Sequence, residues 1–184
     1  MIARSRLLLR ILSAGVSVWI QETDQVWFKN TRVELARFIR GTPGARDASI
    51  VALDDGDYRT MTTPGTPTIC MGFVLLQKGP LTVEILATAI DTMKSTRNFD
   101  GDDQKIITEV VQSFSPRAHA EKLVRYLPRD AFANGLFLMT PARTFSYDLS
   151  IPDSMVMLHA NWMIGMKKKI DVLQRNNLLC SIEP

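Results

Sequence analysis

Helix-like and strand-like patterns alternate along the first half of this 184-residue chain. Apolar residues recur at helical spacing from Ile2 to Leu12, and a run of β-favouring residues follows from Val16 to Ile20. Such alternation favours an α/β fold of the Rossmann type, with a mixed, mainly parallel sheet flanked by helices. The expected helices are 2–12, 30–40, 80–94, 102–113 and 165–176, and the expected strands are 16–20, 49–53, 69–76, 122–127, 136–139 and 155–159.

Size and composition fit one globular domain over residues 1–184. Hydrophobic residues make up 46% and charged residues 22% of the chain, which is the balance of an ordinary packed domain. The formal net charge of +3 is too small to indicate a nucleic-acid partner, and Lys167–Lys169 is the only basic run. Cys70 and Cys180 are too few for a disulfide framework and lack metal-ligand spacing, so pairing and free thiols both stay open.

The N-terminal segment superficially resembles a signal peptide, because basic residues precede apolar ones. Arg10 interrupts the apolar stretch, however, and no small-residue cleavage site follows it. The stretch is also too short and too interrupted to span a membrane. A helix followed by a strand fits this segment better, so we expect neither a targeting segment nor a membrane span here.

Acidic residues follow the first expected strand directly, in the stretch Glu22-Thr23-Asp24. In open α/β sheets, ligands bind at the carboxyl ends of parallel strands. Two carboxylates one residue apart can reach the same divalent cation, and oxygen ligands suit Mg²⁺ or Mn²⁺. Such a cation neutralises the charge that develops on a departing diphosphate. The alternative is a solvated loop, which is common for acidic residues at strand ends.

The second group with chemical potential begins at His159, which ends an apolar stretch. Gly165 then opens a basic helix that contains Lys169. Backbone N–H groups at a helix N-terminus and nearby lysines suit phosphates, and His159 could be a third metal ligand. The alternatives are a structural histidine and a solvated lysine-rich face.

The third group is Asp102-Asp103-Gln104, at the expected start of a helix. Aspartate is a favoured N-cap residue, so a purely structural role is one interpretation. In the other, a carboxylate and an amide line a sugar pocket. The sequence contains no phosphate-binding P-loop, dinucleotide fingerprint, nucleophile elbow, zinc-protease motif or C-x-x-C pair. His119 lies in a polar segment, and we expect it to be exposed.

Taken in order, these elements resemble the nucleotide-diphospho-sugar transferase domain of glycosyltransferase family 77 and its relatives, over nearly the whole chain. The segment 13–28 resembles the family's stretch of a strand, a D-x-D motif and an apolar residue before Trp. The family's further motifs are matched by Cys70-Met71-Gly72-Phe73, by Asp103-Gln104, by Leu127-Pro128 with Phe132 and Asn134-Gly135, and by the ending His159, Asn161, Gly165, Lys169 and Leu173.

The resemblance implies a GT-A fold and retaining transfer of a sugar from a nucleotide-sugar to a glycan or glycoprotein acceptor, with Mn²⁺ or Mg²⁺. It also implies a location in the Golgi lumen, as for many such enzymes. By the resemblance, the residues divide into metal ligands (Glu22, Asp24, His159), diphosphate contacts (Gly165, Lys169, Asn161) and a sugar pocket near the reacting carbon (Asp103, Gln104). The last pair would position the donor and stabilise charge.

Two departures from the family pattern keep a second hypothesis open. The first acidic position is Glu22 rather than Asp. The family domain also begins with a strand and loop that contact the base, and these are expected before Met1, so we expect an N-terminally incomplete domain. The alternatives are therefore an active transferase and an inactive GT-A-like binding module or truncated fragment. The separation of Asp24 and His159 in a structure distinguishes them.

Overall fold

The computed structural model describes residues 2–56, 67–96, 102–114, 123–138, 149–161, 163 and 165–179. The chain divides into two compact units. The first unit comprises Met1–Gln21 and Arg37–Leu127, and the second comprises Glu22–Ala36 and Pro128–Pro184. The chain therefore changes unit at 21/22, at 36/37 and at 127/128. The single domain expected over 1–184 stays a prediction.

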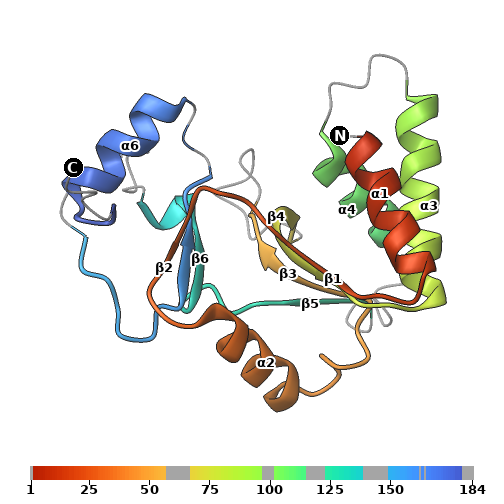
Figure 1. Ribbon diagram of the computed structural model, residues 1–184, viewed down its shortest axis with the longest axis horizontal. Coiled ribbons are helices and arrows are strands. Elements are labelled where there is room, and N and C mark those ends of the chain that lie inside the picture. The colour runs from red at the N-terminus through yellow and green to blue at the C-terminus, as the bar shows by residue number, and fades with distance from the viewer. Residues whose placement is uncertain are drawn as a thin grey trace. The chain divides into compact units, whose positions relative to one another are not determined.

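The first unit contains a four-stranded sheet in the order β1-β4-β3-β5 (Figure 1). Its strands are β1 (Val18–Gln21), β3 (Ile50–Asp54), β4 (Ile69–Leu76) and β5 (Val124–Tyr126). β4 pairs antiparallel with both β1 and β3, whereas β3 and β5 are parallel. The central strands are almost wholly buried, as their near-continuous apolar sequences require.

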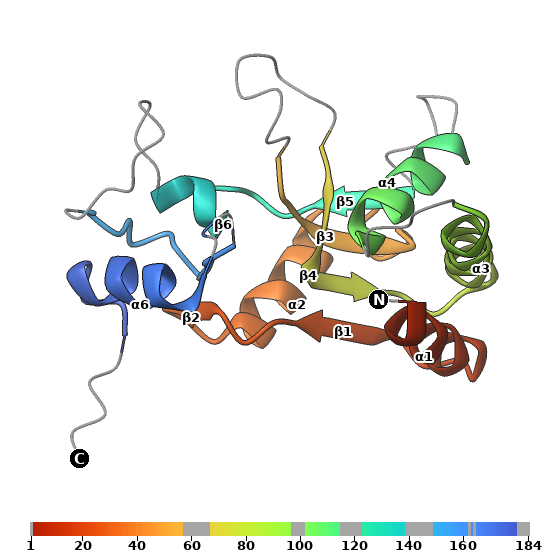
Figure 2. The same cartoon turned by 90° about the horizontal axis from the view of Figure 1, so that it is seen from above.

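Three helices of the first unit lie together on the sheet: α1 (Ile2–Ser13), α3 (Pro80–Ser95) and α4 (Asp103–Ser113) (Figures 1 and 2). They share one core with the strands, in which Leu12, Ile85 and Ile107 are buried beside Val74. Gly15 ends α1 in the left-handed region at φ 76°, and its N–H donates to the carbonyl oxygen of Leu12 at 2.9 Å.

The second unit contains a three-stranded sheet in the order β2-β7-β6, with β2 (Gln25–Trp27), β6 (Phe132–Asn134) and β7 (Met157–His159). β7 pairs antiparallel with β2 and parallel with β6. The 3₁₀ helix η1 (Gly135–Leu138) and helix α6 (Met166–Arg175) complete its core, which includes Leu138, Leu158 and Leu173. Helix α2 (Thr31–Gly41) begins in the second unit and ends in the first.

The predicted α/β class with mixed sheets is confirmed, but the expected parallel majority is not what the described strands show. Three of their five pairings are antiparallel and two are parallel. The strand before the acidic residues, β1, is itself antiparallel to its neighbour. The alternation of helices and strands indicates the class, but it does not determine which strands become neighbours or in which direction they run.

The strand expected at 136–139 is wrong over its described residues, because Gly135–Leu138 is the 3₁₀ helix. Asn134 explains the turn, since its Oδ1 atom accepts the N–H of Leu136 at 3.0 Å. His119, Cys180 and most of the loop expected at 60–67 lie outside the described residues. Among the helices that are described, none is long and apolar enough to span a membrane.

Candidate metal and diphosphate site

Backbone pairing in the second unit brings the acidic stretch to the histidine. Glu22–Asp24 is the link that leads into β2, and β2 pairs with β7 so that Gln25 lies opposite His159. The N–H of Ala160 donates to the carbonyl oxygen of Asp24 at 2.8 Å, which extends the same pairing by one position. The main chain therefore determines that Asp24 and His159 are neighbours.

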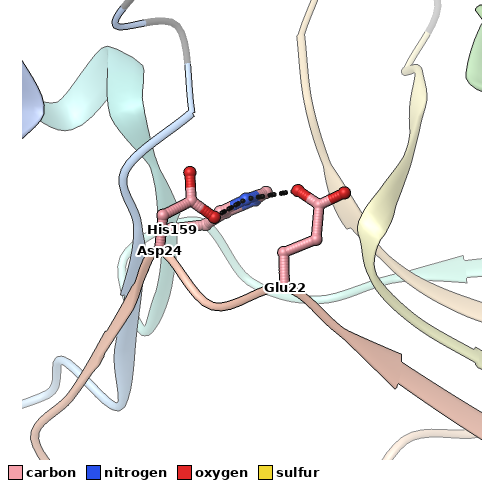
Figure 3. A group of neighbouring side chains, drawn as sticks. All are labelled: Glu22, Asp24 and His159. Carbon is pink, nitrogen blue, oxygen red and sulfur yellow. Dashed lines mark hydrogen bonds and ion pairs between the residues drawn. The ribbon is translucent and has the colours of Figure 1, made fainter. Parts of the chain in front are cut away.

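The side chains of Glu22, Asp24 and His159 converge on one point. The Nε2 atom of His159 lies 3.2 Å from Oδ1 of Asp24 and 3.2 Å from Oε2 of Glu22. One ligand atom from each of the three residues lies within 4.8 Å of the others. Figure 3 shows the imidazole flanked by the two carboxylates. The side chain of His159 is 2% exposed and that of Glu22 is 45% exposed, so the group opens to solvent on the Glu22 side.

This donor set fits a divalent cation. Protein oxygen ligands lie about 2.0–2.6 Å from Mg²⁺ or Ca²⁺, so two ligand atoms at right angles are about 2.8–3.7 Å apart. Both imidazole–carboxylate separations of 3.2 Å fall in that range. Carboxylates suit Mg²⁺ and Mn²⁺, whereas an imidazole favours a transition metal. Mn²⁺ therefore matches the set better than Mg²⁺ does.

Asp24 also has a cationic neighbour, because the Nζ atom of Lys169 lies 2.5 Å from its Oδ2 atom. The hydrogen bond with His159 is the main cause that holds the pKa of the Asp24 carboxyl well below its usual range. The hydrogen bond from Lys169 acts in the same direction, whereas burial acts in the opposite one. Asp24 is therefore ionised at neutral pH, as a metal ligand must be.

Helix α6 carries two of the three residues predicted to contact the diphosphate, Gly165 at its N-cap and Lys169. Gly165 is its N-cap in the left-handed region, at φ 92°, and Lys169 lies one turn further on. Gly165 itself has no side chain that could cap this N-terminus. Lys169 is partly buried, while Lys167 and Lys168 are exposed. The amide groups of the first turn and the ammonium of Lys169 thus belong to one helix end, which suits an anion.

Asn161 has a structural contact that the sequence did not indicate. Its Oδ1 atom accepts the N–H of Gly135 at 2.7 Å. The backbone is so close there that a Cβ atom added to Gly135 would lie 1.8 Å from the carbonyl oxygen of Asn161. Asn161 thus fixes the end of β7 to the junction of β6 and η1. The diphosphate contact expected of it stays a prediction.

Asp103 and Gln104 belong to the first unit, whereas the three candidate metal ligands belong to the second. Asp103 begins α4 and is 2% exposed, and Arg4 donates to both of its carboxylate oxygens, at 2.8 and 2.9 Å from one guanidinium nitrogen. The Nε atom of Arg4 adds a third bond at 3.2 Å. Asp102 is the N-cap, since its Oδ1 atom accepts the N–H of Lys105 at 3.1 Å.

Gln104 bridges two strand ends of the first unit. Its Oε1 atom accepts the N–H of Met71 at 3.0 Å, and its Nε2 atom donates to Oδ2 of Asp55 at 2.7 Å. Sequence reasoning assigned no role to Asp55 or to Arg4. The position of Asp55 could have indicated a role, because it directly follows a strand, as Glu22 does. No sequence pattern indicated a role for Arg4, because its partner Asp103 lies 99 positions away.

Fold and site together define a GT-A-like α/β protein. A family model described as nucleotide-diphospho-sugar transferase matches residues 1–173, and the chain belongs to that family. The crystal structure of mouse xyloside xylosyltransferase 1 in its apo form is similar, with a TM-score of 0.53 and 15% sequence identity. At this identity the likeness shows the fold alone.

The match to the mouse enzyme covers 87% of this chain and 63% of that one, so this chain spans less than two thirds of the solved structure. No curated protein sequence matches this chain significantly. The family resemblance inferred from the sequence motifs is confirmed.

Proposed function

We propose that this chain is a glycosyltransferase that moves a sugar from a nucleotide-sugar donor to a glycan or glycoprotein acceptor, with retention of configuration and with Mn²⁺ or Mg²⁺. The observation that carries the proposal is the group formed by Glu22, Asp24 and His159, whose ligand atoms lie within 4.8 Å of one another. Family membership makes a nucleotide-diphosphate donor the natural ligand of such a group.

Each site residue has a role in this proposal. Glu22, Asp24 and His159 hold the cation, which neutralises charge on the diphosphate leaving group when bound. The N-terminus of α6 at Gly165 and the ammonium of Lys169 bind the phosphate oxygens. Asn161 contributes a further contact to the diphosphate. The amide of Gln104 and the carboxylate of Asp103 line the sugar pocket, where they position the donor and stabilise charge.

The name of the solved neighbour suggests which sugar to try first. That protein is a xyloside xylosyltransferase, so a nucleotide-linked xylose with a xyloside acceptor is a first pair to test. Hexose donors form the second set. A location in the Golgi lumen follows from the family resemblance and stays a prediction.

Calorimetric titration with Mn²⁺, followed by uridine, guanosine and adenosine diphosphates, tests the proposal. Asp24→Asn and His159→Ala should weaken Mn²⁺ binding at least about tenfold, because each removes one of three ligands. Asp171→Asn is the control. It makes the same change of charge as Asp24→Asn, but at a surface ion pair with Arg175 in α6. Mn²⁺ binding that is equal in all four proteins contradicts the proposal.

A second candidate function is a binding module that kept the fold without turnover. Two observations favour it: Glu22 replaces the family's aspartate, and both oxygens of Asp103 are engaged by Arg4. Mn²⁺-dependent nucleotide binding without transfer from any nucleotide-sugar donor would support this alternative.

A further inference from the structure

We propose that the ammonium of Lys169 stays paired with Asp24 until a divalent cation binds there, and that its release couples the binding of the cation to the binding of the nucleotide. The inference rests on the proposed function, because it assumes that Asp24 is a metal ligand. It adds a second role for Lys169, which the sequence assigned to the diphosphate alone.

Asp24 is engaged on both carboxylate oxygens. Oδ1 lies 3.2 Å from Nε2 of His159, and Oδ2 lies 2.5 Å from Nζ of Lys169. The ammonium therefore holds the same carboxylate that the divalent cation would share with Glu22 and His159. Two cations on one carboxylate repel each other. The side chains of Asp24 and Lys169 are only 19% and 22% exposed, so solvent screens this repulsion incompletely.

Lys169 is also able to leave. A lysine carries its charge on a flexible four-carbon stem, and the ammonium rotates freely to a new acceptor. The residue lies one turn beyond Gly165, at the helix end whose first-turn amides suit an anion. An ammonium released from Asp24 therefore has a second partner nearby, once a phosphate is bound at that helix end.

This arrangement predicts effects of opposite sign when the ammonium is removed. Without nucleotide, the divalent cation no longer competes with Lys169, so its affinity rises. With the cation bound, the diphosphate loses a charged contact, so nucleotide affinity falls. If Lys169 bound only the phosphate, its removal would change the nucleotide affinity and leave the cation affinity unaltered. If Lys169 only stabilised the fold, its removal would weaken the binding of both the cation and the nucleotide.

The experiment compares the full chain with Lys169→Met and Lys167→Met. The second variant removes the same charge from an exposed position in the same helix, so it reports the general loss of positive charge. We expect Lys169→Met to bind Mn²⁺ about tenfold more tightly in calorimetry without nucleotide. We expect it to bind uridine or guanosine diphosphate about tenfold more weakly at saturating Mn²⁺. The affinities of Lys167→Met should stay within about twofold of wild type.

Lys169→Gln serves as a second neutral variant in case the methionine variant folds poorly. Lys169→Arg is a control that keeps the charge, so it should not tighten Mn²⁺ binding. Unchanged or weaker Mn²⁺ binding in folded neutral variants overturns the inference. If wild type still binds Mn²⁺ through Asp24 and His159, the proposed function survives that result. If the wild-type protein binds no Mn²⁺, that result contradicts both the inference on Lys169 and the proposed function.

Discussion

Arg4 donates hydrogen bonds to both carboxylate oxygens of Asp103, which lies 99 positions further along the chain. The contact ties α1 to the first residue of α4. Asp103 is 2% exposed, whereas the side chain of Arg4 is 28% exposed. Loss of the arginine would therefore leave a carboxylate charge buried without its counter-ion, which is more costly than loss of a surface ion pair.

We predict that Arg4→Met lowers the free energy of unfolding by about 3 kcal/mol, because it leaves the buried charge of Asp103 uncompensated. Asp102→Ala, which removes the neighbouring N-cap, should lower it by only about 1 kcal/mol. Urea unfolding of both variants measures the difference. Similar losses of unfolding free energy in the two variants would mean that Arg4 does not compensate the buried charge of Asp103.

Gln104→Ala should lower kcat about a hundredfold if its amide stabilises charge in the sugar pocket, while lowering the free energy of unfolding by about 1–2 kcal/mol. The matched control is Gln77→Ala. Gln77 also makes two hydrogen bonds in the first unit, to the carbonyl oxygens of Ala45 and Ala48 at 2.9 and 2.7 Å. That variant should lose similar stability with unchanged kcat. Equal kcat in the two variants would limit Gln104 to a structural role.

Asp24 should contribute to the pH dependence of stability in the metal-free protein. The pKa of its carboxyl is lowered in the folded state, so its contribution is fully present above about pH 3.8, the ordinary value, and is lost as the pH falls further. Asp24→Asn should therefore be less stable than wild type at pH 6, with a gap that narrows below pH 4. Urea midpoints across this range measure the gap. A gap of constant size would rule out the ionised carboxylate as its cause.

Gly135→Ala should disrupt the second unit. The added Cβ atom would meet the backbone of Asn161 at 1.8 Å, which requires a main-chain shift and should cost more than about 3 kcal/mol. Gly41→Ala, at the end of α2, is the control because nothing lies within 4 Å of its added Cβ atom. It should be neutral or slightly stabilising. Thermal unfolding distinguishes the two variants, and Mn²⁺ titration shows whether Glu22, Asp24 and His159 still converge.

The sequence predicted the long elements closely and only some of the short ones. The boundaries of β4 were predicted as observed, and the helices were predicted within a residue or two, because their apolar patterns extend over eight residues or more. β2 and β6 were missed, whereas β5 and β7, which are equally short, were predicted because they lie in longer apolar stretches. The apolar run at 136–138 was assigned to a strand, since the capping contact that turns it depends on Asn134 and on the space left by Gly135.

The convergence of the three candidate metal ligands was predictable because the family motif supplied long-range information that local patterns lack. The convergence of Glu22, Asp24 and His159 depends on strand pairing across 135 positions, which no local spacing reveals. The same limit explains what was missed. The contacts of Lys169 with Asp24, of Arg4 with Asp103 and of Gln104 with Asp55 are each made between residues far apart in sequence.

The pairing of β2 with β7 also has a consequence for the nascent chain. Glu22 and Asp24 leave the ribosome 135 positions or more ahead of His159, and most of the first unit is translated between them. At common rates of translation this interval is on the order of ten seconds. Throughout it β2 has no partner strand of its own sheet, and the two carboxylates have no imidazole. The candidate metal site is therefore among the last parts to assemble during synthesis, after the first unit has had time to fold.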